Sequence, residues 1–270
     1  MLQKINETAD FLMQQFGRKA KIAIVLGTGL NDLGADIEIE KAIDYKDIVN
    51  FPVSTVKGHE GKLLYGTLSG VKVIAMQGRF HYYEGYNMKE ITFPVRVFKA
   101  MGIETLILSN ASGGMNPLYK VGEMVIITDH INLFPENPLR GKNYDELGDR
   151  FPDMSEAYTR VLIEKAENIA KHYQIPYQKG VYVGTVGPTF ETPSEYKMFR
   201  LLGGDCVGMS TVPEAIVARH AGMQCIAFSV ITDLGIIGVV EKVSHEEVLN
   251  AAKIAEPKIR QVVKELVKEI

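Results

Sequence analysis

Short apolar runs alternate with amphipathic stretches along the whole chain, a pattern typical of an α/β sheet covered by helices. The apolar runs predict strands at residues 21–26, 62–68, 71–77, 105–109, 124–128, 180–186, 206–209 and 224–231. Helical spacing predicts an N-terminal helix that ends at Gly17, then helices near 87–101, 156–173, 193–202, 213–221 and 245–270. We therefore expect a single α/β domain over residues 1–270, with a central β-sheet flanked by helices.

Two local signals refine this picture. Ser69 and Gly70 form a two-residue turn between two predicted strands, so part of the sheet is antiparallel and the sheet is mixed. Helix starts at Thr192, Thr211 and Ser244 each have a hydroxyl followed by an acid three residues later, which is the capping pattern of a helix N-terminus. Such N-termini attract negative charge.

The composition is that of a soluble protein with a core. Of 270 residues 46% are hydrophobic, and 30 Lys and Arg against 33 Asp and Glu give a net charge of -3, too balanced for a nucleic-acid or anionic-membrane partner. The most apolar stretch, 226–240, contains Asp233 and is shorter than the roughly 18 to 20 residues of a membrane span. The N-terminus lacks the apolar region of a signal peptide. Cys206 and Cys225 lie in apolar stretches, which indicates buried thiols and a cytoplasmic location.

Several segments that follow predicted strands suit an anion. The glycine-rich turn around Thr28 has neither dinucleotide nor P-loop spacing, so it is a generic anion cradle or a plain turn. Arg79 and His81 can aim a guanidinium and an imidazole at one oxyanion, unless Arg79 pairs with Glu84 and His81 faces solvent. His59, between glycines, is a weaker candidate.

Other strand ends suit a planar ring. The small residues at 109–114 let a flat ligand lie against backbone, or form a tight crossover turn. Phe190 can stack on a ring whose N–H groups Glu191 accepts, or it belongs to the core while Glu191 favours the next helix dipole. Ser210 lies beside a capped helix start. Together these strand ends favour a ligand that combines phosphate with a heterocycle.

Six segments, spread in order along the chain, resemble the trimeric purine nucleoside phosphorylases, which share a family with the methylthioadenosine phosphorylases. They read GTGL at 27–30, GRFHYYEG at 78–85, NASGG at 110–114, DHINL at 129–133, GPTFET at 187–192 and VGMSTVPE at 207–214. The resemblance implies the nucleoside phosphorylase fold. It also implies reversible phosphorolysis, in which phosphate attacks the anomeric carbon of a purine nucleoside and gives free base and (deoxy)ribose 1-phosphate. Phosphate is then a co-substrate, and no metal or other cofactor is implied.

The resemblance also implies a set of site residues. The phosphate would contact Thr28, His59, Arg79, His81, the backbone N–H of Ala111 and Ser210. The ribose would contact Tyr83, Met209, His245 and Phe151. The base would contact Ala111, Phe190, Glu191, Val207, Gly208, Met209 and Asp233. The catalytic candidates are His81, Glu191 and Asp233. Phe151 lies in the long irregular segment 132–155, which is too long for a simple connection, and would enter the neighbouring ribose pocket of a homotrimer.

The chain departs from the family at Asp233, where the family uses Asn to hold N7 of the leaving base. An ionised Asp only accepts hydrogen bonds and suits a 6-aminopurine, whereas a protonated Asp can donate to O6 and act as a general acid. Glu191 suits the N1–H and 2-amino edge of guanine, and His245 disfavours a 5′-methylthio group. We expect inosine or guanosine as first substrates; the alternative is an adenosine- or methylthioadenosine-preferring phosphorylase.

Two other classes fit the residues less well. A nucleoside hydrolase would use water and typically a calcium ion, and Asp32, Asp36, Asp44 and Asp47 lack the spacing of its motif. A non-catalytic nucleoside-binding protein would not require an anion cradle facing the sugar. Product formation that depends on added phosphate separates these classes from a phosphorylase.

Overall fold

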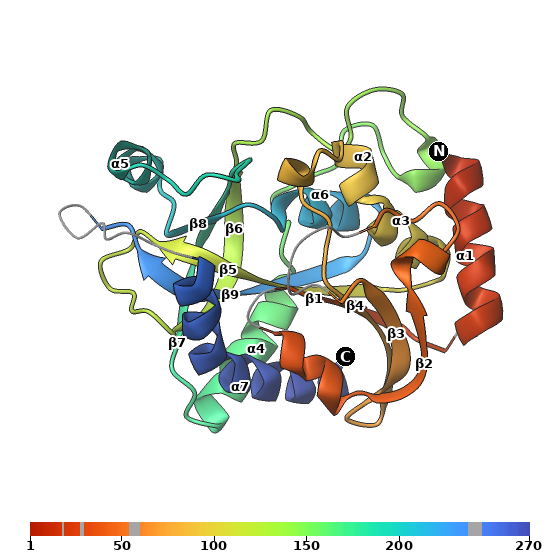
Figure 1. The fold of residues 1–270 in the computed structure, drawn as a ribbon, viewed down its shortest axis with the longest axis horizontal. Coiled ribbons are helices and arrows are strands. Elements are labelled where there is room, and N and C mark those ends of the chain that lie inside the picture. Colours follow the sequence, from red (N-terminus) through yellow and green to blue (C-terminus); the bar gives the residue numbers. More distant parts are fainter. Residues whose placement is uncertain (18, 28–29, 54–59, 237–244) are drawn as a thin grey trace.

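One nine-stranded mixed sheet organises the computed structural model, which describes residues 1–17, 19–27, 30–53, 60–236 and 245–270, with Asn31 and His245 described by their backbone alone. The strands run in the order β2-β3-β4-β1-β5-β8-β7-β6-β9. Their bounds are β1 (Ile22–Leu26), β2 (Glu38–Asp44), β3 (Lys62–Leu68), β4 (Val71–Gln77), β5 (Thr105–Gly114), β6 (Met124–Asn132), β7 (Tyr177–Gly184), β8 (Cys206–Gly208) and β9 (Gln224–Leu234). Because β9 also pairs with β5, the last five strands of this order close into a small barrel, with the other four extending from it (Figure 1).

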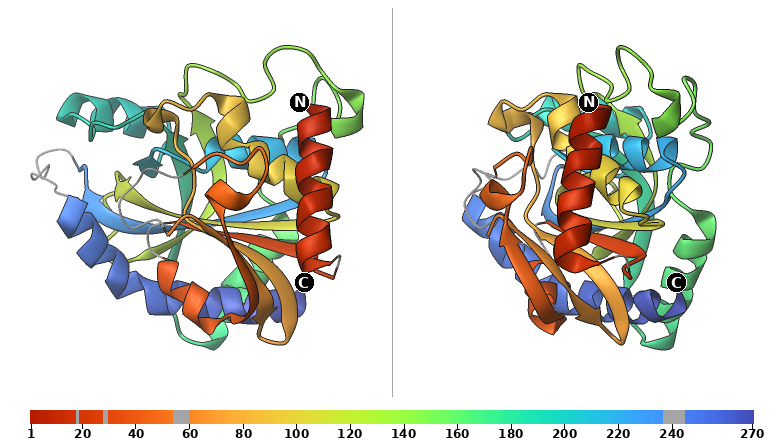
Figure 2. Two further views of the ribbon diagram at one scale, coloured as in Figure 1. Left: turned by 45° about the vertical axis from the view of Figure 1, so that its right-hand side comes forward. Right: turned by 90° about the vertical axis from the view of Figure 1, so that its right-hand side faces the viewer.

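Helices cover both faces of this sheet. They are α1 (Leu2–Phe16), α2 (Met88–Ile91), α3 (Phe93–Ala100), α4 (Arg160–His172), α5 (Pro193–Leu201), α6 (Val212–His220) and α7 (His245–Glu269). On one side α1 packs against α3 and α3 packs against α6, whereas α4 and α7 pack together on the other side (Figure 2). Among the described helices, none is long and apolar enough to cross a membrane. The α/β architecture predicted from the alternating pattern is therefore confirmed.

The mixed character of the sheet is also confirmed. β3 and β4 are antiparallel and meet at Ser69 and Gly70, whose φ angles of 51° and 85° are those of a tight hairpin turn. β1 is parallel to both β4 and β5, and β5 is parallel to β9. The carboxyl ends of these four parallel strands consequently lie at one edge, which is where ligands bind in open α/β sheets.

Most strand predictions are right in position and wrong in length. β5 and β9 continue beyond their apolar runs to Gly114 and Leu234, since they stay paired with one another up to those residues. β6 likewise continues to Asn132, whereas β7 begins earlier and ends at Gly184. No predicted strand corresponds to β2. This strand is exposed and polar because it pairs only with β3 and forms the edge of the sheet.

The helix predictions need two corrections. The helix expected at 87–101 is broken at Thr92 into α2 and α3, because Pro94 has no N–H for an uninterrupted helix and lies in the first turn of the second piece, which begins at Phe93. The helix expected from 156 begins at Arg160. The capping box at Thr192 is confirmed by mutual hydrogen bonds of 3.2 and 2.7 Å with Glu195, while Ser244 lies outside the described residues.

Candidate active site

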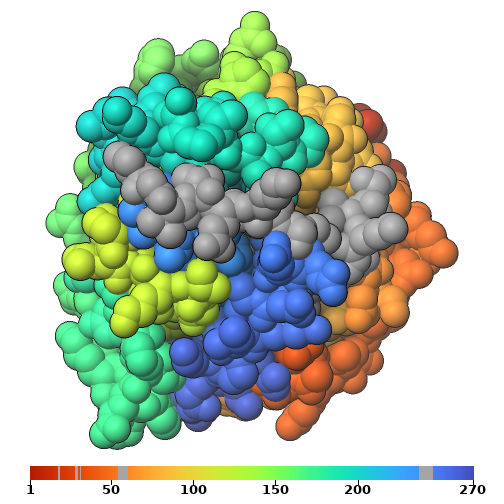
Figure 3. Space-filling model, turned by 60° about the vertical axis from the view of Figure 1, so that its left-hand side comes forward, coloured from red at the N-terminus to blue at the C-terminus, as the bar shows by residue number. Residues whose placement is uncertain are grey.

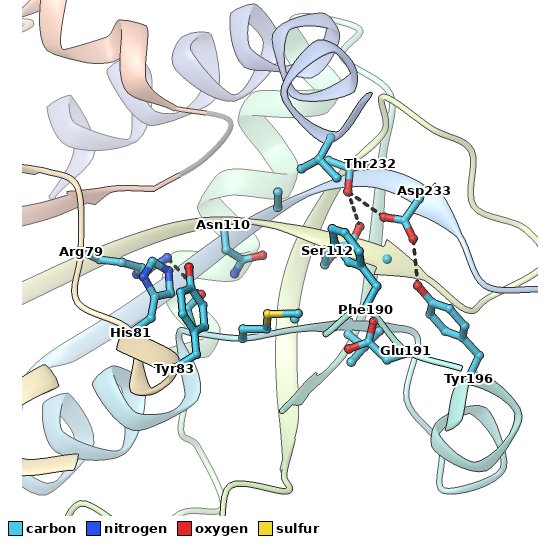
Figure 4. Close-up of a pocket in the computed structure, with 17 residues that line it drawn as sticks. Arg79, His81, Tyr83, Asn110, Ser112, Phe190, Glu191, Tyr196, Thr232 and Asp233 are labelled. Carbon is cyan, nitrogen blue, oxygen red and sulfur yellow. Dashed lines mark hydrogen bonds between the residues drawn. The ribbon is translucent and has the colours of Figure 1, made fainter. Parts of the chain in front are cut away.

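A cavity opens where the ends of β4, β5, β8 and β9 converge. It gathers the greater part of the predicted site residues, namely Arg79, His81, Tyr83, Ala111, Phe190, Glu191, Val207, Gly208, Met209, Ser210 and Asp233. These residues come from segments more than 150 positions apart in the chain, and the sheet brings them together. Arg79 follows β4 and Asp233 lies near the end of β9, whereas Val207 lies on β8, which runs antiparallel to β5. Figure 4 shows Arg79, His81 and Tyr83 at one end of the cavity, with Phe190, Glu191 and Asp233 at the other.

Four predicted residues are not among those that line it. Thr28 and His59 lie outside the described residues, and the side chain of His245 is likewise not described. Phe151 is 88% exposed and lies apart, with the Arg150 guanidinium over its ring. Phe151 therefore does not line the cavity of its own chain.

Arg79 is fixed by Glu214 at the first turn of α6. Its Nη2 donates to Oε2 and Oε1 of Glu214 at 2.9 and 3.1 Å, and the guanidinium is only 2% exposed. Its Nη1 donates to the Ser109 carbonyl and to the Ser210 hydroxyl at 2.5 and 3.2 Å. A buried guanidinium requires such a partner, since an unpaired buried charge costs several kcal/mol (about 3 to 5). The alternative left open by the sequence, in which Arg79 pairs with Glu84, is wrong.

Glu84 instead holds His81. Its Oε1 accepts from the His81 backbone N–H at 2.8 Å and lies 3.1 Å from Nδ1 of the imidazole. Burial lowers the pKa of His81, an effect opposed by the Glu84 hydrogen bond and reinforced by the charge of Arg79. Because a carboxylate only accepts, Nδ1 is assigned the proton and Nε2 the lone pair. The ring stacks on Tyr83 with centroids 4.7 Å apart, so His81 is packed in the site and does not face solvent.

The opposite end of the cavity is acidic and aromatic. Burial raises the pKa of Glu191, and the negative charge of Asp233 raises it further. Glu191 accepts a hydrogen bond from Thr185 at 3.3 Å, which orients it. The ring of Phe190 is 44% exposed, so it lies open to the cavity rather than in the core. The alternative that places Phe190 in the core is therefore wrong.

A buried polar network supports the floor between the two ends. Asn110 donates to the Thr211 hydroxyl at 2.8 Å and accepts from Ser229 at 2.6 Å, and Ser229 lies 2.6 Å from the Ser112 hydroxyl. These partners join β5 to β9 and to the start of α6. Because buried polar groups are costly when unpaired, the network holds the three elements in one arrangement.

Sequence reasoning missed several cavity residues. These are Asn110, Ser112, Gly113, Tyr196, Thr232 and Val248. Asn110 and Ser112 belong to segment 109–114, which the sequence indicated as a place for a flat ligand. The sequence does not show which of its side chains face the cavity, because that depends on how the strand pairs. Tyr196 occupies an ordinary core position of an amphipathic helix by spacing alone, so no sequence signal distinguishes it. Within the described ranges, no group of three His, Cys, Asp or Glu side chains is arranged to hold a metal ion.

The arrangement defines what the cavity can bind. One end offers guanidinium and hydroxyl donors beside a neutral imidazole, which is suited to an oxyanion. The other end offers an aromatic face and two carboxyl groups, which are suited to a ring with polar edges. Between them lie the Tyr83 ring and Met209, which offer an apolar surface. A ligand that fits carries an anion and a heterocycle at opposite sides of a compact middle part.

Comparison with known proteins shows which family the chain resembles. A family model described as Phosphorylase superfamily matches residues 21–268. Purine nucleoside phosphorylase 1 of Bacillus subtilis is 49% identical over 267 residues, which are 99% of this chain and 98% of that protein. The crystal structure of schistosoma purine nucleoside phosphorylase in complex with hypoxanthine has a TM-score of 0.94 at 37% identity, covering 100% of this chain and 98% of that one. The Schistosoma mansoni enzyme in complex with adenosine gives the same TM-score and coverage at 38% identity.

Proposed function

Since the chain belongs to the phosphorylase superfamily, and to the purine nucleoside phosphorylases within it, we propose that this cavity carries both halves of phosphorolysis. The chain is an enzyme of this class, which uses inorganic phosphate as co-substrate. The observation that supports the site assignment best is the opposite character of the two cavity ends. Phosphate attacks C1′ of the sugar between them, the glycosidic bond breaks, and the purine departs with its bonding electron pair.

The basic end holds the phosphate. Arg79 Nη1 and the Ser210 hydroxyl, 3.2 Å apart, donate to its oxygens together with the Ala111 backbone N–H. Neutral His81 accepts the proton of hydrogen phosphate at Nε2, because Glu84 fixes the tautomer. Thr28 and His59 complete this set. Since the sugar becomes oxocarbenium-like as the bond breaks, a fixed anion beside it stabilises the transition state.

The acidic end holds the base, on which negative charge develops as the glycosidic bond breaks. Phe190 stacks on the purine, Val207 and Gly208 line its edge, and Glu191 accepts from N1–H and the 2-amino group of guanine. Asp233 meets the 6-substituent and N7. A protonated Asp233 can give N7 its proton, which neutralises the departing base and makes Asp233 the general acid.

Asp233 also widens the choice of base. A protonated carboxyl group offers one donor and one acceptor, which matches N7 and the 6-amino group of adenine. A 6-oxopurine presents two acceptors, N7 and O6, at the same edge, so only one of them is matched. We place inosine and guanosine first, because Glu191 suits their N1–H, and adenosine as a further substrate. His245 meets the 5′-hydroxyl and disfavours methylthioadenosine.

The ribose site is shared between subunits. Tyr83 and Met209 border the sugar from within the chain, whereas Phe151 is 88% exposed and enters the neighbouring site of a homotrimer. A large apolar side chain with so little cover is typical of an interface residue. The proposal needs no metal and no cofactor besides phosphate. A cytoplasmic location fits the two buried free thiols, Cys206 and Cys225.

Release of free base from inosine, with and without phosphate, tests this function. Base and ribose 1-phosphate should form in equal amounts only when phosphate is present. Release of base in phosphate-free buffer, with ribose as the other product, would identify a hydrolase instead. Binding of inosine without any turnover would identify a binding protein.

A further inference from the structure

Tyr196, on α5, holds the carboxyl group of Asp233, at the end of β9. Its hydroxyl donates to Oδ2 of Asp233 at 2.9 Å, and the residue is only 3% exposed (Figure 4). Burial raises the pKa of Tyr196, and the charges of Asp233 and Glu191 raise it further, so the hydroxyl keeps its proton and remains a donor. The other oxygen, Oδ1, accepts from the Thr232 hydroxyl at 2.9 Å. Each carboxyl oxygen thus has its own hydroxyl neighbour.

Two glycines make room for this contact. A Cβ on Gly235 would lie 2.1 to 2.3 Å from atoms of the Tyr196 ring, and one on Gly113 would lie 2.7 Å from its hydroxyl. Any larger residue at either position would displace the tyrosine. The helix that carries Tyr196 begins at the Thr192 capping box, directly after Glu191, which fixes the tyrosine relative to both acids. Figure 3 shows the loop after β5 beside the start of α7 on one face of the molecule, with α5 further along the same face. The contact is therefore built into three separate elements.

The order of atoms along the purine edge identifies which oxygen meets which group. This edge runs from N1 through the 6-substituent to N7, and Glu191 takes N1 in the proposed binding mode. Figure 4 shows Glu191 and Tyr196 on the same side of Asp233, and α5, which carries Tyr196, begins just after Glu191. Oδ2, which Tyr196 binds, is accordingly the oxygen on the Glu191 side and meets the 6-substituent in the proposed binding mode.

We infer that Tyr196 is a specificity-determining positioning residue, which keeps Oδ2 of Asp233 a hydrogen-bond acceptor toward the 6-substituent and so favours adenosine relative to inosine. This inference rests on the proposed function. A hydroxyl that donates to Oδ2 uses that oxygen as an acceptor and disfavours a proton on it, so Oδ2 can also accept from the 6-amino group of adenosine. The Thr232 hydroxyl donates to Oδ1 in the same way and has a second acceptor in the Ser112 carbonyl at 3.3 Å.

A 6-oxopurine meets the opposite situation. Its O6 faces Oδ2, and two acceptors without a proton between them repel. Without the Tyr196 hydroxyl, Oδ2 can carry a proton and donate it to O6. Tyr196→Phe keeps the ring that packs on Gly235 and removes only the hydroxyl, so it isolates this effect from the packing of α5.

The test measures kcat/KM for adenosine and for inosine at saturating phosphate in the wild-type chain and in Tyr196→Phe. The adenosine-to-inosine ratio should fall about tenfold, the size expected for one hydrogen bond to an ionisable group. Tyr119→Phe is the matched control, because it also removes one buried hydroxyl hydrogen bond, to the Lys179 carbonyl at 2.8 Å, away from the cavity. The control should leave the ratio within twofold of wild type.

A second comparison separates positioning from a merely structural role. Tyr196→Phe combined with Asp233→Asn should favour inosine more than Asp233→Asn alone, since the amide is then free to turn its NH₂ group toward O6. If Tyr196→Phe lowers kcat/KM for both nucleosides equally, or changes neither, the inference is wrong while the phosphorylase function stands. Absence of phosphate-dependent turnover in the wild-type chain would instead overturn the function itself.

Discussion

Arg79 and Glu214 form a buried, bidentate ion pair that joins the end of β4 to the first turn of α6. Nη2 of Arg79 lies 2.9 Å from Oε2 and 3.1 Å from Oε1 of Glu214, and Nε lies 3.3 Å from Oε1. Glu214 also accepts from the Thr211 backbone N–H at 2.9 Å, so the same carboxylate caps α6. Nη1 of the same guanidinium donates to the Ser109 carbonyl and, toward the cavity, to the Ser210 hydroxyl. The pair therefore sets the geometry of the proposed phosphate site.

Arg79→Ala should raise the KM for phosphate steeply and lower kcat/KM for phosphate by about 100-fold or more. It removes a cavity donor and also leaves Glu214 buried without its partner, and such losses cost about 2 to 5 kcal/mol. Steady-state kinetics with phosphate as the varied substrate measure the effect. Arg260→Ala is the control, because Arg260 forms an equally bidentate pair with Asp36, at 2.7 and 3.0 Å, outside the cavity. Similar phosphate kinetics in both variants would refute the phosphate assignment.

Asp233→Asn should shift base preference toward 6-oxopurines, because an amide NH₂ group donates to O6 and a carboxylate does not. The ratio of kcat/KM for inosine to that for adenosine should rise about tenfold, which corresponds to one hydrogen bond gained and one lost. Initial rates with each nucleoside at saturating phosphate measure it. An unchanged ratio would remove Asp233 from the base site.

Activity on guanosine should depend on pH through Glu191. Burial and the nearby Asp233 raise the pKa of Glu191, and only its ionised form accepts from N1–H and the 2-amino group. Guanosine activity is therefore full above the raised pKa and is lost as the pH falls through it, at a higher pH than an ordinary glutamate allows. A pH profile of kcat/KM for guanosine measures this limb.

Glu191→Gln separates this limb from other acid-side titrations. His81 also gains a proton at low pH, but burial lowers its pKa, so its limb lies below the ordinary range of histidine. In Glu191→Gln the limb due to Glu191 should disappear and overall guanosine activity should fall, while the His81 limb remains. A profile of the same shape in wild type and variant would contradict the assignment of Glu191.

Phe151→Ala should raise the KM for nucleoside about tenfold without changing thermal stability. The side chain is 88% exposed on its own chain, so its removal opens no cavity in the core, but it deprives the neighbouring ribose of an apolar contact. Leu118→Ala is the control, since Leu118 is also largely exposed and does not line the cavity. Sedimentation should report a trimer for both variants. Wild-type KM in Phe151→Ala, or a monomer in solution, would contradict the shared site.

The sequence predicts the fold well wherever burial decides the structure. β3 and β4 match their predicted bounds at both ends, since their apolar runs coincide with their pairing. The edge strand β2 was missed because its residues face solvent and carry the pattern of a polar loop. The ends of β5 and β9 were missed because they continue as mostly small or polar residues held by mutual pairing, which no local hydrophobic pattern records.

The site also contains residues that the sequence predicts and residues that it does not. Arg79, His81 and Glu191 were found because they stand in distinctive motifs, and the structure places all three at one cavity. Their partners were not found, since Glu214 lies 135 residues from Arg79 and only the assembly of the sheet brings the end of β4 and the start of α6 together. Tyr196 was missed because a buried aromatic on a helix is ordinary core by pattern, and its hydroxyl acquires meaning only from the position of Asp233.

A crystal of this chain grown with phosphate and hypoxanthine tests the central claim most directly. The claim is that a single cavity holds an anion and a purine at opposite ends. Phosphate should lie within hydrogen-bond distance of Arg79 Nη1 and Ser210 Oγ, and hypoxanthine should stack on Phe190 with its edge toward Glu191 and Asp233. Density for the two ligands in separate pockets, or for the base beside Arg79, would contradict the account.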